Sequence, residues 1–128
     1  MAEMSNYLEN ALINATLRNT SYTTPTTVYL ALYTDDPTDA DTGTEVTGNG
    51  YARQSITFGA PSNGVSSNTA AIEFPQATGS WGTVSYVGIR DASTSGNLLY
   101  HTALDASKTI ATGDVFRVAI GSLSVTFA

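Results

Sequence analysis

Short apolar runs separated by turn residues fill most of this 128-residue chain, and their spacing constrains the fold more than any other feature. In several runs, apolar and polar side chains alternate with the period of two that places every second residue on one face of a strand. Clusters of Gly, Pro, Asn, Asp and Ser separate the runs, as expected where a chain turns. About seven to eight short strands predict a mainly β fold, a single-domain β-sandwich of jelly-roll-like or Ig-like type over residues 1–128.

The predicted strands differ in character. Residues 27–34 carry apolar side chains on both faces, which is typical of a strand in the middle of a sheet. The other expected strands cover residues 51–58, 70–74, 82–90, 98–104, 108–110, 115–120 and 122–127. Residues 60–68 are rich in Gly, Ser and Asn and are expected to form a loop.

One α-helix is expected, over residues 6–19, ahead of the first long strand. Its apolar residues recur at helical spacing and form one stripe: Leu8, Ala11, Leu12 and Ala15. Asn6 is expected to cap the helix, with Glu9 reaching back to it in a variant of the capping box. We expect this helix to cover an open end or face of the sandwich, although its stripe could also meet a partner.

The composition excludes several classes of protein. The chain has one His and no Cys, so it cannot form a disulfide framework, a thiolate nucleophile or a cluster of imidazole ligands. Five basic residues against eleven acidic ones make binding to nucleic acid improbable. No apolar run approaches the roughly 20 residues of a membrane span, and the N-terminal residues do not resemble a signal peptide. We therefore expect a soluble, cytoplasmically made protein without membrane contact.

Residues 35–50 are expected to form a long polar loop, which in a compact domain is either functional or mobile. The loop carries five acidic residues and no basic residue beside them: Asp35, Asp36, Asp39, Asp41 and Glu45. Flexible acidic loops can supply the six to eight oxygen ligands that Ca²⁺ takes, so this loop is a candidate metal site. The spacing does not match an EF-hand, and we favour a solvated turn whose Asp side chains cap backbone groups. We expect no cofactor.

No pattern in the sequence indicates a catalytic site. His101 lies in a predicted strand without a nucleophile motif beside it, which favours a structural or surface role. Trp81 and the seven Tyr could line a sugar-binding or partner surface, but packing of Trp81 over one end of the core is the simpler interpretation. Arg53 and Arg90 lie in strands otherwise poor in charge, and we expect one of them to pair with a buried or interfacial carboxylate rather than to bind a ligand.

Several short blocks together resemble a widespread family of small virion proteins of tailed phages and prophages. The blocks are YLEN at 7–10, YLALYTDDPT at 29–38, GTEV at 43–46, GYARQ at 50–54, IEFP at 72–75, WGTVSYVGIRD at 81–91, GNLLY at 96–100 and GD at 113–114. They cover nearly the whole chain, and the set is more specific than any one block. Family members are described as tail-fibre-like proteins or as head decoration (cement) proteins. The resemblance implies a non-enzymatic virion structural protein, made in the cytoplasm of the bacterial host, and brings no catalytic residues with it.

Chain length helps to choose between the two virion roles. A tail fibre proper carries a long shaft with repeats or heptads, and this sequence has neither. We therefore expect a capsid decoration (cement) protein that stabilises the head lattice by bridging capsid subunits. A tail-fibre or baseplate adaptor is the alternative, and a host-glycan-binding module is a more remote one. A small glycan hydrolase would need two carboxylates about 5–10 Å apart in a cleft.

The expected partners follow from this role. They are the major capsid protein and further copies of the chain, as a dimer or trimer, or else tail or baseplate proteins. The residues proposed to contact them are apolar or aromatic: Met4, Leu8, Tyr22, Trp81 and Tyr86.

Overall fold

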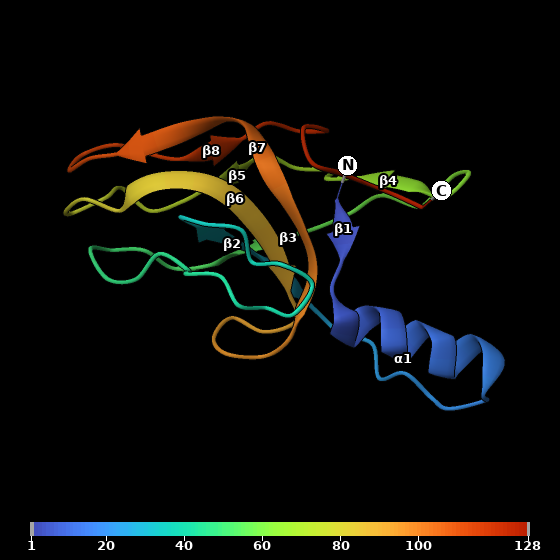
Figure 1. Cartoon of the computed structure of the whole chain (residues 1–128). Coiled ribbons are helices and arrows are strands. Elements are labelled where there is room, and N and C mark those ends of the chain that lie inside the picture. Colours follow the sequence, from blue (N-terminus) through green and yellow to red (C-terminus); the bar gives the residue numbers. More distant parts are fainter. Residues whose placement is uncertain (1, 128) are drawn as a thin grey trace.

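The computed structural model describes residues 2–127 of the chain (Figure 1). Its largest element is a five-stranded antiparallel sheet in the order β1-β7-β6-β2-β3. The strands of this main sheet are β1 (Glu3–Met4), β2 (Val28–Tyr33), β3 (Gln54–Ile56), β6 (Gly82–Arg90) and β7 (Leu98–Ile110). Two small antiparallel sheets pair β4 (Val65–Ser67) with β9 (Ser124–Thr126) and β5 (Ile72–Glu73) with β8 (Arg117–Val118). The predicted mainly β fold is confirmed.

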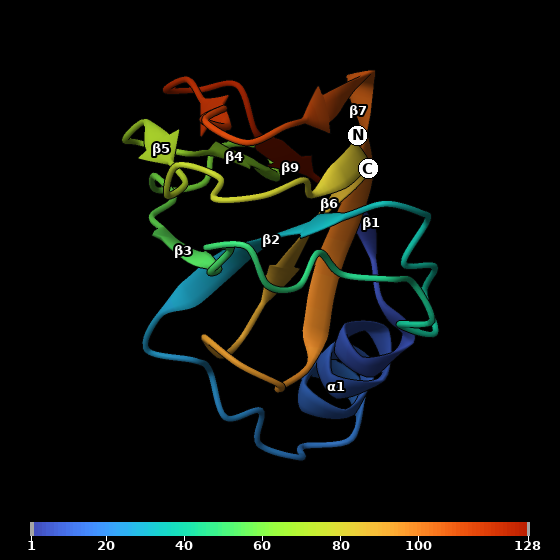
Figure 2. The same ribbon diagram turned by 90° about the vertical axis from the view of Figure 1, so that its left-hand side faces the viewer.

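The apolar core lies between the main sheet and the small sheets. Figure 2 shows β4, β5 and β9 gathered on one side of the main sheet. The main sheet supplies one set of buried core residues, which are Leu30, Leu32, Val84, Val87 and Ile89. The facing segments supply another, which are Ile72, Phe74, Phe116, Leu123 and Val125. Two layers that share one core make the arrangement sandwich-like.

β2 is an interior strand, as its sequence predicts. It pairs with β3 on one side and with β6 on the other. Its last four residues are buried, which requires apolar neighbours on both faces of the sheet. On one face the ring of Tyr33 lies against Gly88 of β6, where an added Cβ would approach Tyr33 Cε1 to 2.8 Å. Gly88 therefore leaves the space that this ring occupies.

Strands β3, β5, β8 and β9 are shorter than predicted. Three larger differences concern β7, β4 and β1. β7 is one strand of 13 residues that includes both 98–104 and 108–110, because β6 pairs along most of its length. β4 forms inside the segment 60–68, which was expected to be a loop, because it pairs with β9 far along the chain. β1 was not predicted, and it is held only by its pairing with β7. Long-range pairing decides all three cases, and local sequence does not reveal it.

The single described helix, α1 (Asn6–Leu17), begins where predicted but has a different cap. Ser5 is the N-cap, and its side-chain oxygen accepts the Leu8 amide hydrogen at 3.2 Å. The Ser5 hydroxyl also donates to the carbonyl oxygen of Leu98, at the start of β7. The expectation that Asn6 caps the helix is wrong by one residue, because Ser5 meets both the helix and the sheet.

The helix ends two residues before the predicted boundary. Asn19 has a left-handed backbone conformation, with φ of 52°, and the Thr20 amide turns back to donate to the Asn14 carbonyl at 3.0 Å. Asn tolerates this conformation better than most residues, and a left-handed residue just past the last turn is a common helix stop.

Removing the N-cap should destabilise the protein measurably. We expect Ser5→Ala to lower the free energy of unfolding by about 1–2 kcal/mol, because one side chain satisfies a helix amide and a buried carbonyl. Asn6→Ala is the matched control and should cost less, since it removes no cap. Urea unfolding of both variants measures the difference, and an equal or reversed ranking would contradict the assigned cap.

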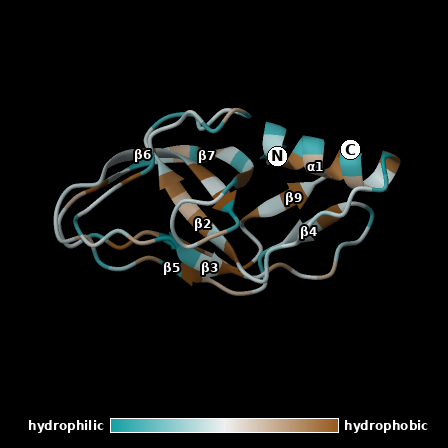
Figure 3. Cartoon of the chain, turned by 90° about the horizontal axis from the view of Figure 1, so that it is seen from below, coloured by the Kyte–Doolittle hydropathy of each residue, from teal (hydrophilic) through white to brown (hydrophobic). Residues whose placement is uncertain are grey.

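α1 lies at the end of the main sheet and packs against β7 (Figure 1). Leu8 is buried, and the rest of the predicted stripe is half-buried, so this face points inward as expected. Ile13 and Leu17 lie elsewhere on the helix and are 53% and 79% exposed. The hydropathy colouring in Figure 3 shows apolar residues along α1 interspersed with polar ones. No helix within residues 2–127 is long and apolar enough to cross a membrane.

Candidate functional site

The predicted acidic loop occupies residues 35–50, between β2 and β3. Its five carboxylates do not converge on one point, because each is held by a different group. Asp35 accepts from Thr44, Asp36 from the Thr38 amide, Asp39 lies against His101, Asp41 pairs with Arg90, and Glu45 pairs with Arg53. The carboxylates therefore fasten the loop to itself and to the main sheet, and the five do not form one Ca²⁺ cage.

Arg90, at the end of β6, makes the attachment with the most partners. Its side chain is 9% exposed and forms a two-pronged ion pair with Asp41, at 2.7 and 2.9 Å. The same guanidinium donates to the Tyr33 hydroxyl at 2.8 Å and to the Gly96 carbonyl at 2.9 Å. Burial works against its charge, but the hydrogen bonds to Asp41 and Tyr33 outweigh burial and raise the pKa of Arg90.

Arg53 and Glu45 form a second attachment. The two guanidinium nitrogens Nε and Nη2 donate to the Glu45 carboxylate at 2.8 and 2.7 Å. The Tyr51 hydroxyl donates to the same carboxylate at 2.6 Å and accepts the Leu32 amide hydrogen of β2 at 3.0 Å. Pairing with a carboxylate was expected for one of the two arginines, and both make such a pair, each with a carboxylate of the loop.

Burial and hydrogen bonding act in opposite directions on the charged form of Glu45. Burial raises the pKa of Glu45, while hydrogen bonds from Arg53 and Tyr51 and the charge of Arg53 lower it. The lowering effects win, so the pKa of Glu45 lies below its ordinary value of 4.5. A carboxyl whose pKa falls on folding stabilises the folded state above its unfolded pKa, and this stabilisation is lost as the pH drops through the folded pKa.

Glu45→Gln should therefore show a pH-dependent loss of stability. At neutral pH we expect it to lower the free energy of unfolding by about 1–3 kcal/mol, because charged hydrogen bonds are lost in a half-buried site. The deficit relative to the unaltered chain should shrink below about pH 4.5. Urea unfolding at neutral and acidic pH measures it. Glu73→Gln, in the exposed pair with Arg117, is the control and should cost less than about 1 kcal/mol. If the stability lost in Glu45→Gln were the same at neutral and acidic pH, the assigned pKa shift would be wrong.

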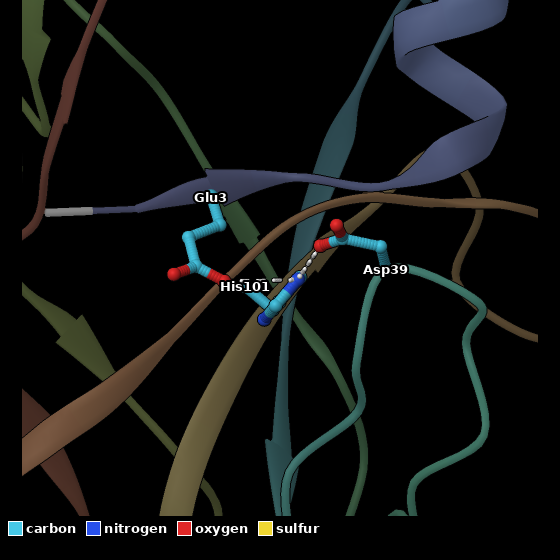
Figure 4. Close-up of side chains that lie close together, drawn as sticks. All are labelled: Glu3, Asp39 and His101. Atoms are coloured by element: carbon cyan, nitrogen blue, oxygen red, sulfur yellow. Dashed lines mark hydrogen bonds and ion pairs between the residues drawn. The ribbon is translucent and has the colours of Figure 1, made fainter.

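His101 of β7 lies at a third junction, shown in Figure 4. The imidazole is 4% exposed, and its Nε2 is 2.8 Å from Asp39 Oδ1 and 3.8 Å from Glu3 Oε2. On the other side of the ring, Nδ1 is 3.7 Å from Asp36 Oδ1. The Nε2 atom of the ring thus faces both Glu3 and Asp39, which come from β1 and from the 35–50 loop. The structural role predicted for His101 agrees with its burial.

The residues proposed for partner contact are dispersed. Met4, Tyr22 and Tyr86 are half-buried in separate parts of the chain. Leu8 and Trp81 are each 4% exposed and pack inside the chain, so their side chains are not available to a partner. The five residues do not form one surface.

Trp81 packs over the core, the simpler of the two roles that its position allowed. Its ring meets Tyr51 edge to face with centroids 5.5 Å apart, and it also contacts Phe74. The indole N–H donates to the Asn49 carbonyl at 2.9 Å, which ties the end of the 35–50 loop to the core. A glycan-binding surface built on an exposed Trp81 is therefore contradicted by the burial of this side chain.

Large apolar side chains are exposed on α1, in β4, in the segment around β8 and near the C-terminus. A groove of about 450 Å³ is lined mainly by apolar side chains of the main sheet and of β4 and β9. Its lining includes Val28, Phe58, Val65, Leu99, Val125 and Phe127. Val65 and Phe127 are more than 40% exposed, as are Tyr7, Ile13 and Leu17 of α1. Exposed apolar side chains near an apolar groove are typical of a surface that contacts another protein.

Sequence reasoning missed two features of these sites. Glu3 joins His101 because β1 pairs with β7, and nothing in a two-residue strand predicts that pairing. The groove also escaped notice, because its lining comes from five separate segments of the chain. The exposed Ile13 and Leu17 could have been found, since both lie off the predicted helical stripe.

Comparison with known families adds one finding. Residues 3–126 match a family model described as Gp80, podophage GP4 fiber I protein gp80. No curated protein sequence matches the chain.

Proposed function

The chain belongs to the family described as podophage GP4 fiber I protein gp80 and is thus a structural protein of the phage virion, in which we propose that it acts as a tail-fibre or baseplate adaptor without enzymatic activity. The observation that carries this proposal is the match over residues 3–126, nearly the whole chain. The resemblance noted from short sequence blocks pointed to the same class of protein.

The family description favours the fibre role over the capsid-cement role. Chain length alone suggested a cement protein that bridges capsid subunits, but the description of the matched family names a fiber protein and does not mention the capsid. We therefore place the proposed partners in the tail: other fibre or baseplate proteins and further copies of this chain. In this proposal residues 1–128 act as one domain whose task is contact.

The exposed part of α1 and the neighbouring groove support a contact function. Ile13 and Leu17 lie on a helix that packs against β7 and whose first residue, Asn6, donates its amide hydrogen to the Asp39 carbonyl of the 35–50 loop. Burying a large aliphatic side chain stabilises a complex by about 1.5–3 kcal/mol. We propose that these side chains contact a neighbouring subunit in the assembled fibre.

Polar substitution of this helix should weaken assembly and leave folding intact. We expect Ile13→Ser with Leu17→Ser to reduce incorporation into virions by at least about tenfold, given the apolar area lost at the contact. The unfolding free energy of the isolated chain should change by less than about 0.5 kcal/mol per site, since both residues are exposed. Ile120→Ser is the matched control, because Ile120 is 67% exposed and belongs to the segment between β8 and β9 rather than to α1. Equal incorporation of the two variants would rule out α1 as the contact.

Imaging of the virion tests the proposed location directly. Virions that carry a tagged copy of the chain should show the label on the tail fibres or baseplate in electron micrographs. Label distributed over the head lattice would overturn the proposal in favour of the cement role. Loss of fibres from virions that lack the protein, with heads that retain their DNA normally, would support it further.

A further inference from the structure

Three separate segments bring ligand atoms together at one end of the main sheet. Glu3 comes from β1, Asp39 from the 35–50 loop and His101 from β7 (Figure 4). One nitrogen or oxygen of each lies within 4.8 Å of the others. Among residues 2–127 no other group of three His, Cys, Asp or Glu side chains meets this condition.

The charges at this junction are unbalanced. Glu3, Asp36 and Asp39 surround a single imidazole. The ion pairs found in residues 2–127 bring no Arg or Lys to these three carboxylates, because Arg90 and Arg53 are taken up by Asp41 and Glu45. Like charges held this close repel one another, and a bound cation removes that repulsion.

The ligand types select the class of cation. Imidazole nitrogen together with carboxylate oxygen suits Zn²⁺ and its first-row neighbours, whereas Ca²⁺ and Mg²⁺ prefer oxygen alone. An ion about 2.1 Å from every ligand requires ligand atoms roughly 3–4 Å apart, close to the 2.8 and 3.8 Å measured from Nε2. The Glu3 side chain is 73% exposed, so it is free to rotate and close the remaining distance.

The surroundings complete the geometry of a metal site. His101 is held by burial, so its Nε2 is fixed toward Glu3 and Asp39. Asp36 faces Nδ1 at 3.7 Å, the side on which carboxylates commonly orient a metal-binding imidazole. A polar cavity of about 400 Å³, lined by Glu3, Asp36, His101 and Asp105 among others, leaves a path for the ion.

We propose that Glu3, Asp39 and His101 bind a divalent first-row transition metal ion, with Zn²⁺ as the ion to test. The ion joins β1, the 35–50 loop and β7 and adds a cross-link at the base of α1. Its function is structural, because it fastens the segment that leads into the proposed contact helix. This inference does not depend on whether the protein occupies the tail or the head.

The composition of the chain allows Zn²⁺ binding at His101 to be followed without interference from other imidazoles or thiols. The chain holds one His and no Cys, so the imidazole signals in an NMR spectrum report His101 alone and no thiolate competes for Zn²⁺. Titration of the full chain with Zn²⁺, followed by calorimetry and by the ring nitrogen shifts of His101, should show one ion bound per chain through Nε2. Ca²⁺ should leave those shifts unchanged. Zn²⁺ should also raise the melting temperature, and EDTA should reverse the effect.

Variants separate a built site from scattered surface binding. Glu3→Gln and Asp39→Asn should each weaken Zn²⁺ binding by roughly tenfold or more, while both chains fold, since these side chains are exposed. Asp105→Asn is the matched control: it lines the same cavity, lies outside the ligand group and should bind Zn²⁺ as the unaltered chain does. The proposal fails if His101 shifts do not respond to Zn²⁺, or if Asp105→Asn weakens binding as much as Glu3→Gln.

Discussion

Arg90→Met is expected to lower the free energy of unfolding by about 3–5 kcal/mol, one of the two largest effects predicted for a single substitution in this chain. The methionine fills most of the space but cannot donate hydrogen bonds. It therefore leaves the buried Tyr33 hydroxyl, the Gly96 carbonyl and the Asp41 carboxylate without their common donor. The main cost comes from the Tyr33 hydroxyl, which is buried and loses its donor, whereas the Asp41 carboxylate is partly exposed and reaches water.

Arg117→Met is the matched control for this effect. Arg117 and Glu73 also form an ion pair, at 3.1 Å, but both side chains are more than half exposed. Exposed pairs contribute about 0–1 kcal/mol, so this variant should unfold almost as the unaltered chain does. Both variants replace an ion-paired Arg with Met, so urea unfolding of the two compares the cost of this change at a buried side chain and at an exposed one. A similar loss of unfolding free energy in both variants would mean that Asp41 and Tyr33 become hydrated when Arg90 is lost, and therefore that the 35–50 loop opens easily.

Trp81→Ala is expected to cost a comparable 3–5 kcal/mol for a different reason. Trp81 fills the space between Tyr51 and Phe74, and its removal leaves a cavity in a core that rigid strands surround. The indole hydrogen bond to the Asn49 carbonyl is lost as well. A midpoint shift without a change in the denaturant slope would identify a loss of stability in a fold that is otherwise unaltered.

Trp81→Phe separates the contribution of ring packing from that of the indole hydrogen bond. It keeps an aromatic ring in the cluster but removes the N–H donor, so it should lose less stability than Trp81→Ala. Val115→Ala, at a 42% exposed apolar position, should change the unfolding free energy by less than about 0.5 kcal/mol. If Trp81→Ala behaved like Val115→Ala, the aromatic cluster would have no central role in the core.

The sequence predicted the elements whose signals are local. β6 was placed at residues 82–90, where it lies, and β2 was recognised as an interior strand because both its faces are apolar. β1 and β4 were missed, because short polar strands are stabilised by partners distant in sequence. Ser5 was overlooked as the cap for the same reason, since its second hydrogen bond reaches Leu98 across the fold.

The sequence indicated which residues of the candidate sites would need partners, but not which residues those partners would be. One of Arg53 and Arg90 was expected to pair with a carboxylate because isolated charges inside strands require partners, but the sequence did not say which carboxylate. The acidic loop was a candidate metal site, although a solvated turn was the favoured interpretation, and only Asp39 of its members joins the ligand group. The other ligands, Glu3 and His101, lie 36 residues before Asp39 and 62 after it in the chain. The sheet register pairs Glu3 with His101, and the fold of the 35–50 loop brings Asp39 to them.

The exposed end of α1 has a consequence for the helix–coil equilibrium of the chain. α1 has 12 residues, and isolated helices of about 12–15 residues are only marginally stable in water. Its first turn gains from the Ser5 cap and the buried Leu8, whereas Leu17 in its last turn lies in solvent. A protein that covers Ile13 and Leu17 therefore also favours the helical state of those turns. Amide hydrogen exchange near Leu17 should be fast in the free chain and slow after assembly, so that joining the virion completes the folding of this helix.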